Sequence, residues 1–120
     1  MKRQRLDARQ ETLRDFAIDA SERGRHFFYV RIPESLGPIA RGEKYEGPLC
    51  QAIGDEGEVT GGGSQLGDGD SIEFCGIDVE VNDRIRGLAI IRKVMRTSGA
   101  PAQTIIEEYV PKYQELPLRD

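Results

Sequence analysis

Two segments of mixed aromatic, charged and apolar residues hold the side chains best suited to chemistry, HFFYVRIP at 26–33 and SIEFCGIDVEV at 71–81. Alternate residues of a β-strand point to opposite faces of a sheet, so each segment sends one mixed row to one side. The residues of these rows are Phe27, Tyr29 and Arg31 on the first segment and Phe74, Asp78 and Glu80 on the second. If the two strands are neighbours, Arg31 can pair with one of the carboxylates.

This mixed face has three uses to consider if helices cover only the opposite face of the sheet. It can bind a protein partner or a second copy of the chain, it can be covered by the chain's own ends, or it can hold a small molecule around Arg31, Asp78 and Glu80. A half-exposed face with a cross-strand ion pair is also common without any function. Acidic pairs on strands, such as Glu107 and Glu108, are more typical of a solvated surface than of acid–base catalysis.

A glycine-rich segment, GEVTGGGSQLGDGD at 57–70, precedes the second of these strands. A Walker-type phosphate loop needs a lysine after its last glycine, and none follows here. The dinucleotide fingerprint GxGxxG fails as well, because Leu66 occupies the position of the third glycine, and both motifs open a helix. We therefore predict that three consecutive glycines admit a close neighbour, which is another backbone, a bulky side chain such as Tyr45 or a bound partner. These are Gly61, Gly62 and Gly63.

Metal and nucleophile chemistry has little support. Asp68 and Asp70 could begin a calcium loop, but the twelfth residue from Asp68 is Val79 instead of the required glutamate. The single histidine, His26, cannot by itself form a histidine-rich metal site. We therefore expect no catalytic residue, no metal and no cofactor.

The two cysteines, Cys50 and Cys75, are too few for a disulfide framework and lack the CxxC spacing of metal and redox sites. Both are expected to be reduced and mostly buried thiols. Cys75 falls on the apolar row of its strand, together with Ile77, Val79 and Val81.

Hydrophobic periodicity and turn residues predict the elements that position these side chains. The predicted elements are an amphipathic helix at 5–23, a strand at 26–33, a loop and a short broken helix near 43–53, strands at 57–66 and 71–81 joined by a turn at 67–70, a helix that follows Asn82 or Asp83 and stops at Gly99, a strand at 102–110 and a tail at 111–120. In the last helix the expected buried stripe includes Ile85, Leu88, Ile91 and Met95.

After the first helix, the order of elements is strand, helix, strand, strand, helix, strand. This order resembles the ferredoxin-like βαββαβ fold over about residues 26–110. The resemblance implies an α+β domain with a four-stranded antiparallel sheet in the order 4-1-3-2 and both helices on one face. The chain then divides into an N-terminal helix at 1–24, a ferredoxin-like domain at 25–110 and a C-terminal tail at 111–120.

Charge and composition limit the classes of function. The chain has 120 residues and a net charge of −4, and 32% of its residues are charged. Residues 1–25 hold seven basic and five acidic residues, and the rest hold ten and sixteen, so the charges +2 and −6 add to that total. An acidic body disfavours nucleic acids and anionic membranes as partners. No apolar run is long enough for a membrane span or a secretory signal, so we expect a cytoplasmic protein.

The stretches RIPESLGPIARGEKYE, GEVTGGGSQL, IEFCGIDVEV and SGAPAQTIIEEY resemble small bacterial proteins of uncharacterised families. Some relatives of those families are similar to immunity proteins that pair with toxins, which implies protein binding. The sequence therefore favours a non-enzymatic interaction module that binds a protein partner or its own copy as a homodimer. The alternative is a small-molecule sensor or an enzyme that uses the face around Arg31, Asp78 and Glu80.

Overall fold

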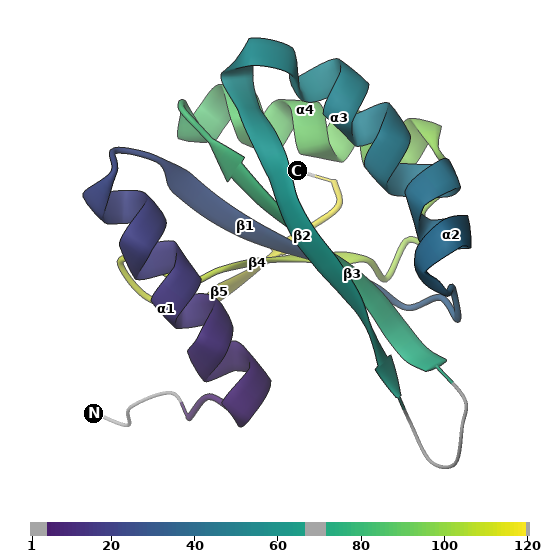
Figure 1. The fold of residues 1–120 in the computed structure, drawn as a ribbon, viewed down its shortest axis with the longest axis horizontal. Helices are drawn as coiled ribbons and strands as arrows, with labels where there is room; N and C mark the ends of the chain where they lie inside the picture. The colour runs from purple at the N-terminus through teal and green to yellow at the C-terminus, as the bar shows by residue number, and fades with distance from the viewer. Residues whose placement is uncertain (1–4, 67–71, 120) are drawn as a thin grey trace.

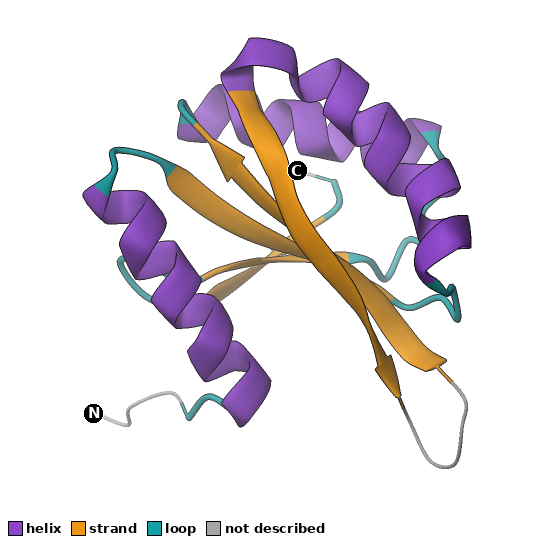
Figure 2. Ribbon diagram, viewed as in Figure 1, coloured by secondary structure: helices purple, strands orange, loops and turns teal. Residues whose placement is uncertain are grey.

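A computed structural model describes residues 5–66 and 72–119 of the chain, which form an α+β protein with a five-stranded antiparallel sheet (Figures 1 and 2). The predicted turn at 67–70, with Asp68 and Asp70, lies outside the described residues. The elements are α1 (Ala8–Glu22), β1 (His26–Ile32), α2 (Pro38–Arg41), a π-helical turn (Gly42–Glu46), α3 (Gly47–Ile53), a 3-10 turn (Gly54–Glu56), β2 (Gly57–Leu66), β3 (Ile72–Val81), α4 (Arg84–Thr97), β4 (Ile105–Glu108) and β5 (Gln114–Pro117).

The strands lie in the order β2-β3-β1-β4-β5, and every neighbouring pair is antiparallel. The first four strands therefore follow the expected order 4-1-3-2, but the expectation of four strands is wrong. The segment predicted as a tail forms β5, because Leu116 packs against the core and Leu118 is buried in it. Proline did not prevent this strand, since Pro117 is the last residue of an edge strand, where a missing N–H is tolerated.

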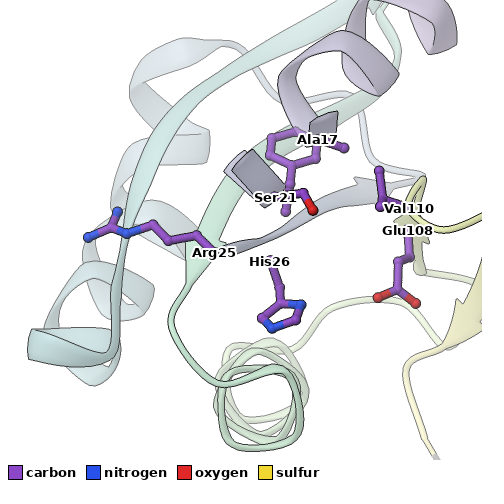
Figure 3. A pocket seen from close by; sticks show the side chains of 7 residues that line it. Ala17, Ser21, Arg25, His26, Glu108 and Val110 are labelled. Atoms are coloured by element: carbon purple, nitrogen blue, oxygen red, sulfur yellow. The ribbon is translucent and has the colours of Figure 1, made fainter. Parts of the chain in front are cut away.

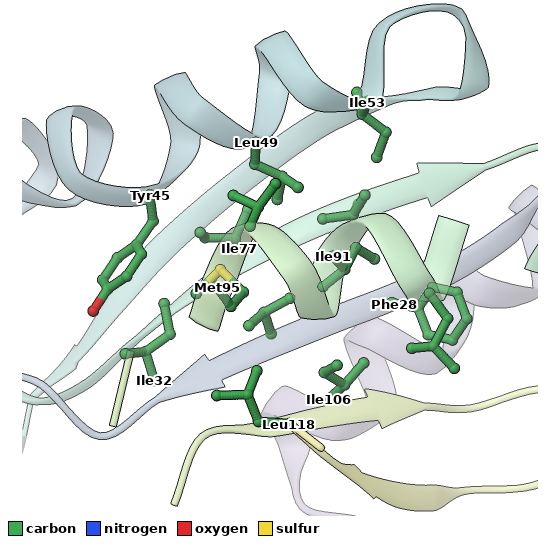
Figure 4. Packing of buried hydrophobic residues seen from close by; sticks show 14 of the residues in the cluster. Phe28, Ile32, Tyr45, Leu49, Ile53, Ile77, Ile91, Met95, Ile106 and Leu118 are labelled. Atoms are coloured by element: carbon green, nitrogen blue, oxygen red, sulfur yellow. The ribbon is translucent and has the colours of Figure 1, made fainter. Parts of the chain in front are cut away.

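The main hydrophobic core lies between the sheet and the helices of one face (Figure 4). Tyr45 and Leu49 reach it from the segment before β2, and Ile91 and Met95 reach it from α4. Its sheet side is formed by alternate residues of β1 and β3, which confirms the predicted apolar rows. These residues are Phe28, Val30 and Ile32 of β1 and Cys75, Ile77, Val79 and Val81 of β3.

The helical segment before β2 is longer than predicted, since it begins at Pro38 instead of near residue 43. Pro38 and Pro48 each occupy a first-turn position of a helix, where the absent N–H would have no intrahelical partner in any case. Between these helices the Gly47 N–H donates a hydrogen bond to the Gly42 carbonyl five residues earlier, which makes the π-helical turn. The glycines and prolines that suggested a broken element thus lie where a continuous one can accommodate them.

Helix α4 begins after Asp83, whose side chain accepts a hydrogen bond of 2.8 Å from the Arg86 N–H. The predicted buried stripe is correct for Leu88, Ile91 and Met95 and wrong for Ile85, which is 78% exposed. Gly87 is buried in its place, and a Cβ at Gly87 would lie 2.5 Å from the Val81 side chain. The close approach of β3 therefore turns the helix away from the orientation that would bury Ile85.

Helix α1 packs on the opposite face of the sheet from α3 and α4 (Figure 1). It begins at Ala8, three residues later than predicted, because Asp7 and Gln10 form a reciprocal capping box at its start. Its buried residues are small or medium in size, namely Leu13, Ala17 and Ala20. Helices thus cover both faces of the sheet, which determines how much of the mixed face is accessible.

Candidate binding site at the outer edge of the sheet

The mixed face exists as predicted, but α1 covers its β1 half. Strands β1 and β3 are neighbours, with Phe27 opposite Glu80 and Tyr29 opposite Asp78. Phe27 and Tyr29 are only 4% and 6% exposed, because they pack under α1 in a second hydrophobic cluster. The expectation of an open face is therefore wrong for this half, since one of the chain's own ends lies over it.

Arg31 does not pair with a carboxylate of β3, contrary to expectation. Its guanidinium lies 3.1 Å from a carboxylate oxygen of Glu107 on β4 and 3.5 Å from one of Glu115 on β5. On the β3 side Arg31 stands opposite Gly76, and Glu80 is already bonded by Arg23 near the other end of the strand. The pairing partner is thus supplied by strands on the far side of β1.

Glu107 is the centre of a buried cluster that holds the first half of α1 on the sheet. Its carboxylate is fully buried and accepts hydrogen bonds of 3.1 and 3.2 Å from Arg9, as well as bonds from Tyr109 at 2.5 Å and Tyr113 at 3.3 Å. Burial and the bond to Glu107 raise the pKa of Tyr109. The Arg9 guanidinium also lies 5.1 Å from the centre of the Tyr29 ring, which adds a cation–π contact. With so many donors engaged, Glu107 has a structural role.

The other end of α1 is held by a second ion-pair group. Arg23 donates two hydrogen bonds, of 2.9 and 2.8 Å, to the nearly buried carboxylate of Glu80, and Arg25 bonds Glu58 on β2 at 2.8 Å. The hydrogen bonds from Arg23 lower the pKa of Glu80. Glu80 is therefore also a structural residue. The prediction that Glu107 and Glu108 form a solvated surface is wrong, because each is buried and ion-paired.

The structure shows which atoms lie close to the three consecutive glycines of β2. A Cβ at Gly62 would lie 2.9 Å from the backbone carbonyl oxygen of Gly76, 3.1 Å from Glu46 Oε1 and 3.3 Å from Arg41 Nε, and a Cβ at Gly61 would lie 3.2 Å from Asp78 Oδ2. The close neighbours are therefore a neighbouring backbone, an ion pair and a carboxylate, and Tyr45 is instead buried in the main core. At Gly63 no described atom lies within 4 Å of that position, so the space above it is open.

Asp78 lies beside this open space. Its side chain is partly buried, and burial raises its pKa. In the described part of the chain it forms no ion pair, unlike Glu80 and Glu107 on the same face. A cation that approached β2 would therefore meet an unpaired carboxylate.

Strand β2 forms one edge of the sheet, and among the described strands only β3 pairs with it. It is ten residues long, contains no proline and carries a single charged residue, Glu58. Its ladder with β3 is interrupted by a bulge between Val59 and Gly61. The opposite edge, β5, has four residues and ends in Pro117. Edge strands are usually protected by short length, charge or proline, and β2 has little of this protection.

The hollow that contains His26 is too small for a substrate (Figure 3). It measures about 20 Å³, roughly the space of a single water molecule. Its lining residues are Ala17, Ser21, Arg25, His26, Phe27, Glu108 and Val110. The Glu108 carboxylate is already bonded by Arg84 at 2.6 and 2.7 Å and by Gln114 at 2.7 Å, so it is not a free acid or base.

The cysteines differ from the prediction in one respect. Cys75 is buried, and burial raises the pKa of its thiol, but Cys50 is exposed on α3. Both are free thiols. Within residues 5–66 and 72–119, no group of histidine, cysteine, aspartate and glutamate side chains could hold a metal ion.

Sequence reasoning missed Arg9, Arg41 and Glu46, whose partners lie far along the chain or on another element. The available signal was the excess of arginine near the chain start together with acidic residues on strands that were otherwise apolar. None of the described helices combines the length and apolar character needed to cross a bilayer. No family model matches the chain, and comparison with curated proteins and with solved structures gives no significant match.

Proposed function

We propose that the chain is a protein-binding module with a ferredoxin-like βαββαβ arrangement extended by α1 and β5, and that it binds an extended segment of a partner along the outer edge of β2. The observation that carries the proposal is the contrast between the two sheet edges. One edge is short and ends in Pro117, and the other is a ten-residue strand with one charged side chain. A long unprotected edge is the structure to which a further strand can be added.

Strand addition uses the backbone for affinity and side chains for specificity. The outward N–H and C=O groups of β2 would pair with the partner backbone at a spacing of about 4.8 Å between strands. Gly61 and Gly63 lie on the same face as Asp78 and carry no side chain that would hinder a bulky partner residue there. The glycines therefore support close approach at the middle of the strand.

The negative charge of the chain favours a basic partner. Asp78 is the unpaired carboxylate next to the glycines, and the whole chain has a net charge of −4. A lysine or arginine at one alternate position of the partner strand would pair with Asp78 in a partly desolvated site. The partner we propose is thus a basic extended segment, and long-range attraction would speed its encounter with the acidic chain. An immunity-like protein that covers a basic site of a toxin would act in this way.

The alternative, a small-molecule site around Arg31, Asp78 and Glu80, has less support. Arg31 is engaged by Glu107 and Glu80 is engaged by Arg23, so two of its three polar groups already have partners. A homodimer formed through two copies of β2 is a further outcome, which sedimentation of the purified chain separates from binding of a different protein.

A peptide display library tests the proposal on the purified chain. We expect enriched peptides to carry lysine or arginine at alternate positions and to slow amide hydrogen exchange within 57–66. The variant Gly63→Lys should weaken binding about tenfold or more, which corresponds to 1.4 kcal/mol, because it places a bulky cation where the partner approaches. Gln103→Lys adds the same charge at an exposed loop position and should bind as the parent chain does. Equal loss in both variants, or protection confined to other strands, would refute the proposal.

A further inference from the structure

A second hollow lies on the face of the molecule away from α1, between helices α3 and α4. Its volume is about 340 Å³, within the range of sites that hold small organic molecules. The lining residues are Pro48 and Ala52 of α3, Ile90, Lys93, Val94 and Thr97 of α4, and Ser98. It is separate from the β2 edge, so it is independent of the function proposed above.

The hollow exists because the two helices present side chains of unequal size. Pro48 and Ala52 are four residues apart and lie on one side of α3, and both are short. Ile90 and Val94 form the facing row of α4. Below them the main core is filled by larger residues such as Leu49, which is fully buried (Figure 4). Two packed helices with short residues on one of them leave volume at the surface above the core.

Three of the lining residues are polar, namely Lys93 and Thr97 of α4 and Ser98 at its C-terminal end. Lys93 is the one charged residue of the lining, and within the described chain it forms no ion pair. Other cations of the same helix are engaged, since Arg84 bonds Glu108 and Arg86 bonds Glu56. An unpaired ammonium at the rim of an apolar hollow favours a ligand with an apolar body and one negative charge.

We propose that the hollow binds a small amphipathic monocarboxylate, with its apolar part between α3 and α4 and its carboxylate at Lys93. Ile90, Val94, Pro48 and Ala52 contact the hydrocarbon, which supplies most of the affinity through burial of apolar area. Thr97 and Ser98 also line the hollow, and their hydroxyls are hydrogen-bond donors for the carboxylate. Apolar area sets the affinity, and Lys93 sets the preference for an anion.

The test is a titration of the isotope-labelled chain with octanoate and, separately, with octanol, followed by amide chemical shifts. We expect both probes to shift the Ala52 and Ile90 amides, and octanoate to bind about twofold to fivefold more tightly than octanol, as a partly exposed ion pair allows. Lys93→Gln should remove this preference, and the matched control Lys112→Gln, in an exposed position outside the hollow, should keep it.

A second variant tests the location of the site without altering charge. Ala52→Leu adds three carbon atoms to the hollow from an exposed helix position, where leucine is well tolerated, and should weaken the binding of both probes while the thermal midpoint is retained. The proposal is overturned if octanoate and octanol bind equally to the parent chain, if the shifts lie outside α3 and α4, or if Ala52→Leu binds octanoate unchanged.

Discussion

Gly76 and Gly63 are paired glycines on one face of the sheet, yet they should respond in opposite ways to the same substitution. They stand opposite each other on β3 and β2. A Cβ at Gly76 would overlap the Tyr29 ring, inside contact distance of its hydroxyl oxygen and Cζ and 2.6 Å from Cε1. A Cβ at Gly63 would meet no described atom within 4 Å. Both glycines have ordinary negative or extended φ values, so backbone strain is not a factor.

The size of the effect follows from what holds the Tyr29 ring. Tyr29 is 6% exposed, packs under α1 and lies beneath the Arg9 guanidinium, so its ring cannot swing away without moving the helix. Overpacking of this kind costs about 1–3 kcal/mol. Replacing glycine by alanine also restricts the unfolded chain, which favours folding by about 0.4–1 kcal/mol at either site. Since that gain is common to both variants, Gly76→Ala should be about 1–3 kcal/mol less stable than Gly63→Ala.

Urea unfolding of both variants, at equal m-values, measures this difference. We expect Gly63→Ala to match or slightly exceed the parent chain in free energy of unfolding. In a Tyr29→Leu background, which lacks the overlapping ring atoms, Gly76→Ala should lose most of its cost, so a double-mutant cycle should show coupling of about 1–3 kcal/mol. Equal stability of the two alanine variants, or a cost that persists in the Tyr29→Leu background, would show that the Tyr29 ring is not what a side chain at position 76 meets.

Three further predictions concern the ion pairs and a backbone contact. Arg9→Met keeps the apolar stem but removes two hydrogen bonds to Glu107, so it should lower the free energy of unfolding by about 1–3 kcal/mol. Amide hydrogen exchange in α1 should become faster, and unchanged exchange would contradict the anchoring of α1 by Arg9. Gly57→Ala should lower the free energy of unfolding by about 3 kcal/mol or more, because its Cβ would lie 2.9 Å from backbone atoms of Glu80 and Val81, and backbone atoms cannot move aside as a side chain can. A smaller loss in urea unfolding than that of Gly76→Ala would contradict this. The pKa of Glu80 is lowered in the folded chain, so its stabilising contribution is present above the ordinary pKa of 4.5 and is lost as the pH falls through the pKa of the folded state. Urea midpoints measured from about pH 3 to about pH 7 should therefore fall less steeply in acid for Glu80→Gln than for the parent chain.

Asp78 should show the opposite pH dependence from its neighbour on β3. Its pKa is raised above the ordinary value of 3.8 by burial, so its favourable contribution is present below that value and is lost as the pH rises through the folded value. Asp78→Asn should therefore be more stable than the parent chain near neutral pH and lose this advantage in acid. A variant whose urea midpoint is lower than that of the parent at pH 7 would show that Asp78 already has a stabilising partner.

The strands were predictable because their alternation records which face is buried. Val30 and Ile77 lie in strictly alternating rows, and a shift by one residue would expose every apolar side chain. The β5 strand was missed because its apolar signal consists of Leu116 and Leu118 alone, beside two prolines. Four residues at an edge carry too little periodicity to be distinguished from an irregular tail.

The site was less predictable than the fold because ion pairs depend on geometry across the sequence. Arg9 and Glu107 are 98 residues apart, and only the docking of α1 brings them together. The same docking determines that Tyr29 is covered, which no property of its own strand reveals. Local patterns therefore assigned these side chains to the right faces of the sheet, but they could not assign the partner of each charge or the helix that covers each ring.

Of the three consecutive glycines of β2, two have close neighbours in the described chain and one has none. This difference is the strongest support that the fold gives to the proposed binding. Gly61 leaves room for the Asp78 carboxylate, and Gly62 leaves room for the ion pair of Arg41 and Glu46. Gly63 has no described neighbour within 4 Å, although a glycine inside a strand costs about 0.5–1 kcal/mol relative to alanine. Packing within the described chain thus accounts for two glycines and leaves the third unexplained, at the middle of the unprotected edge. The proposed partner strand on β2 would supply the missing close neighbour, so Gly63→Ala should preserve stability and still weaken partner binding.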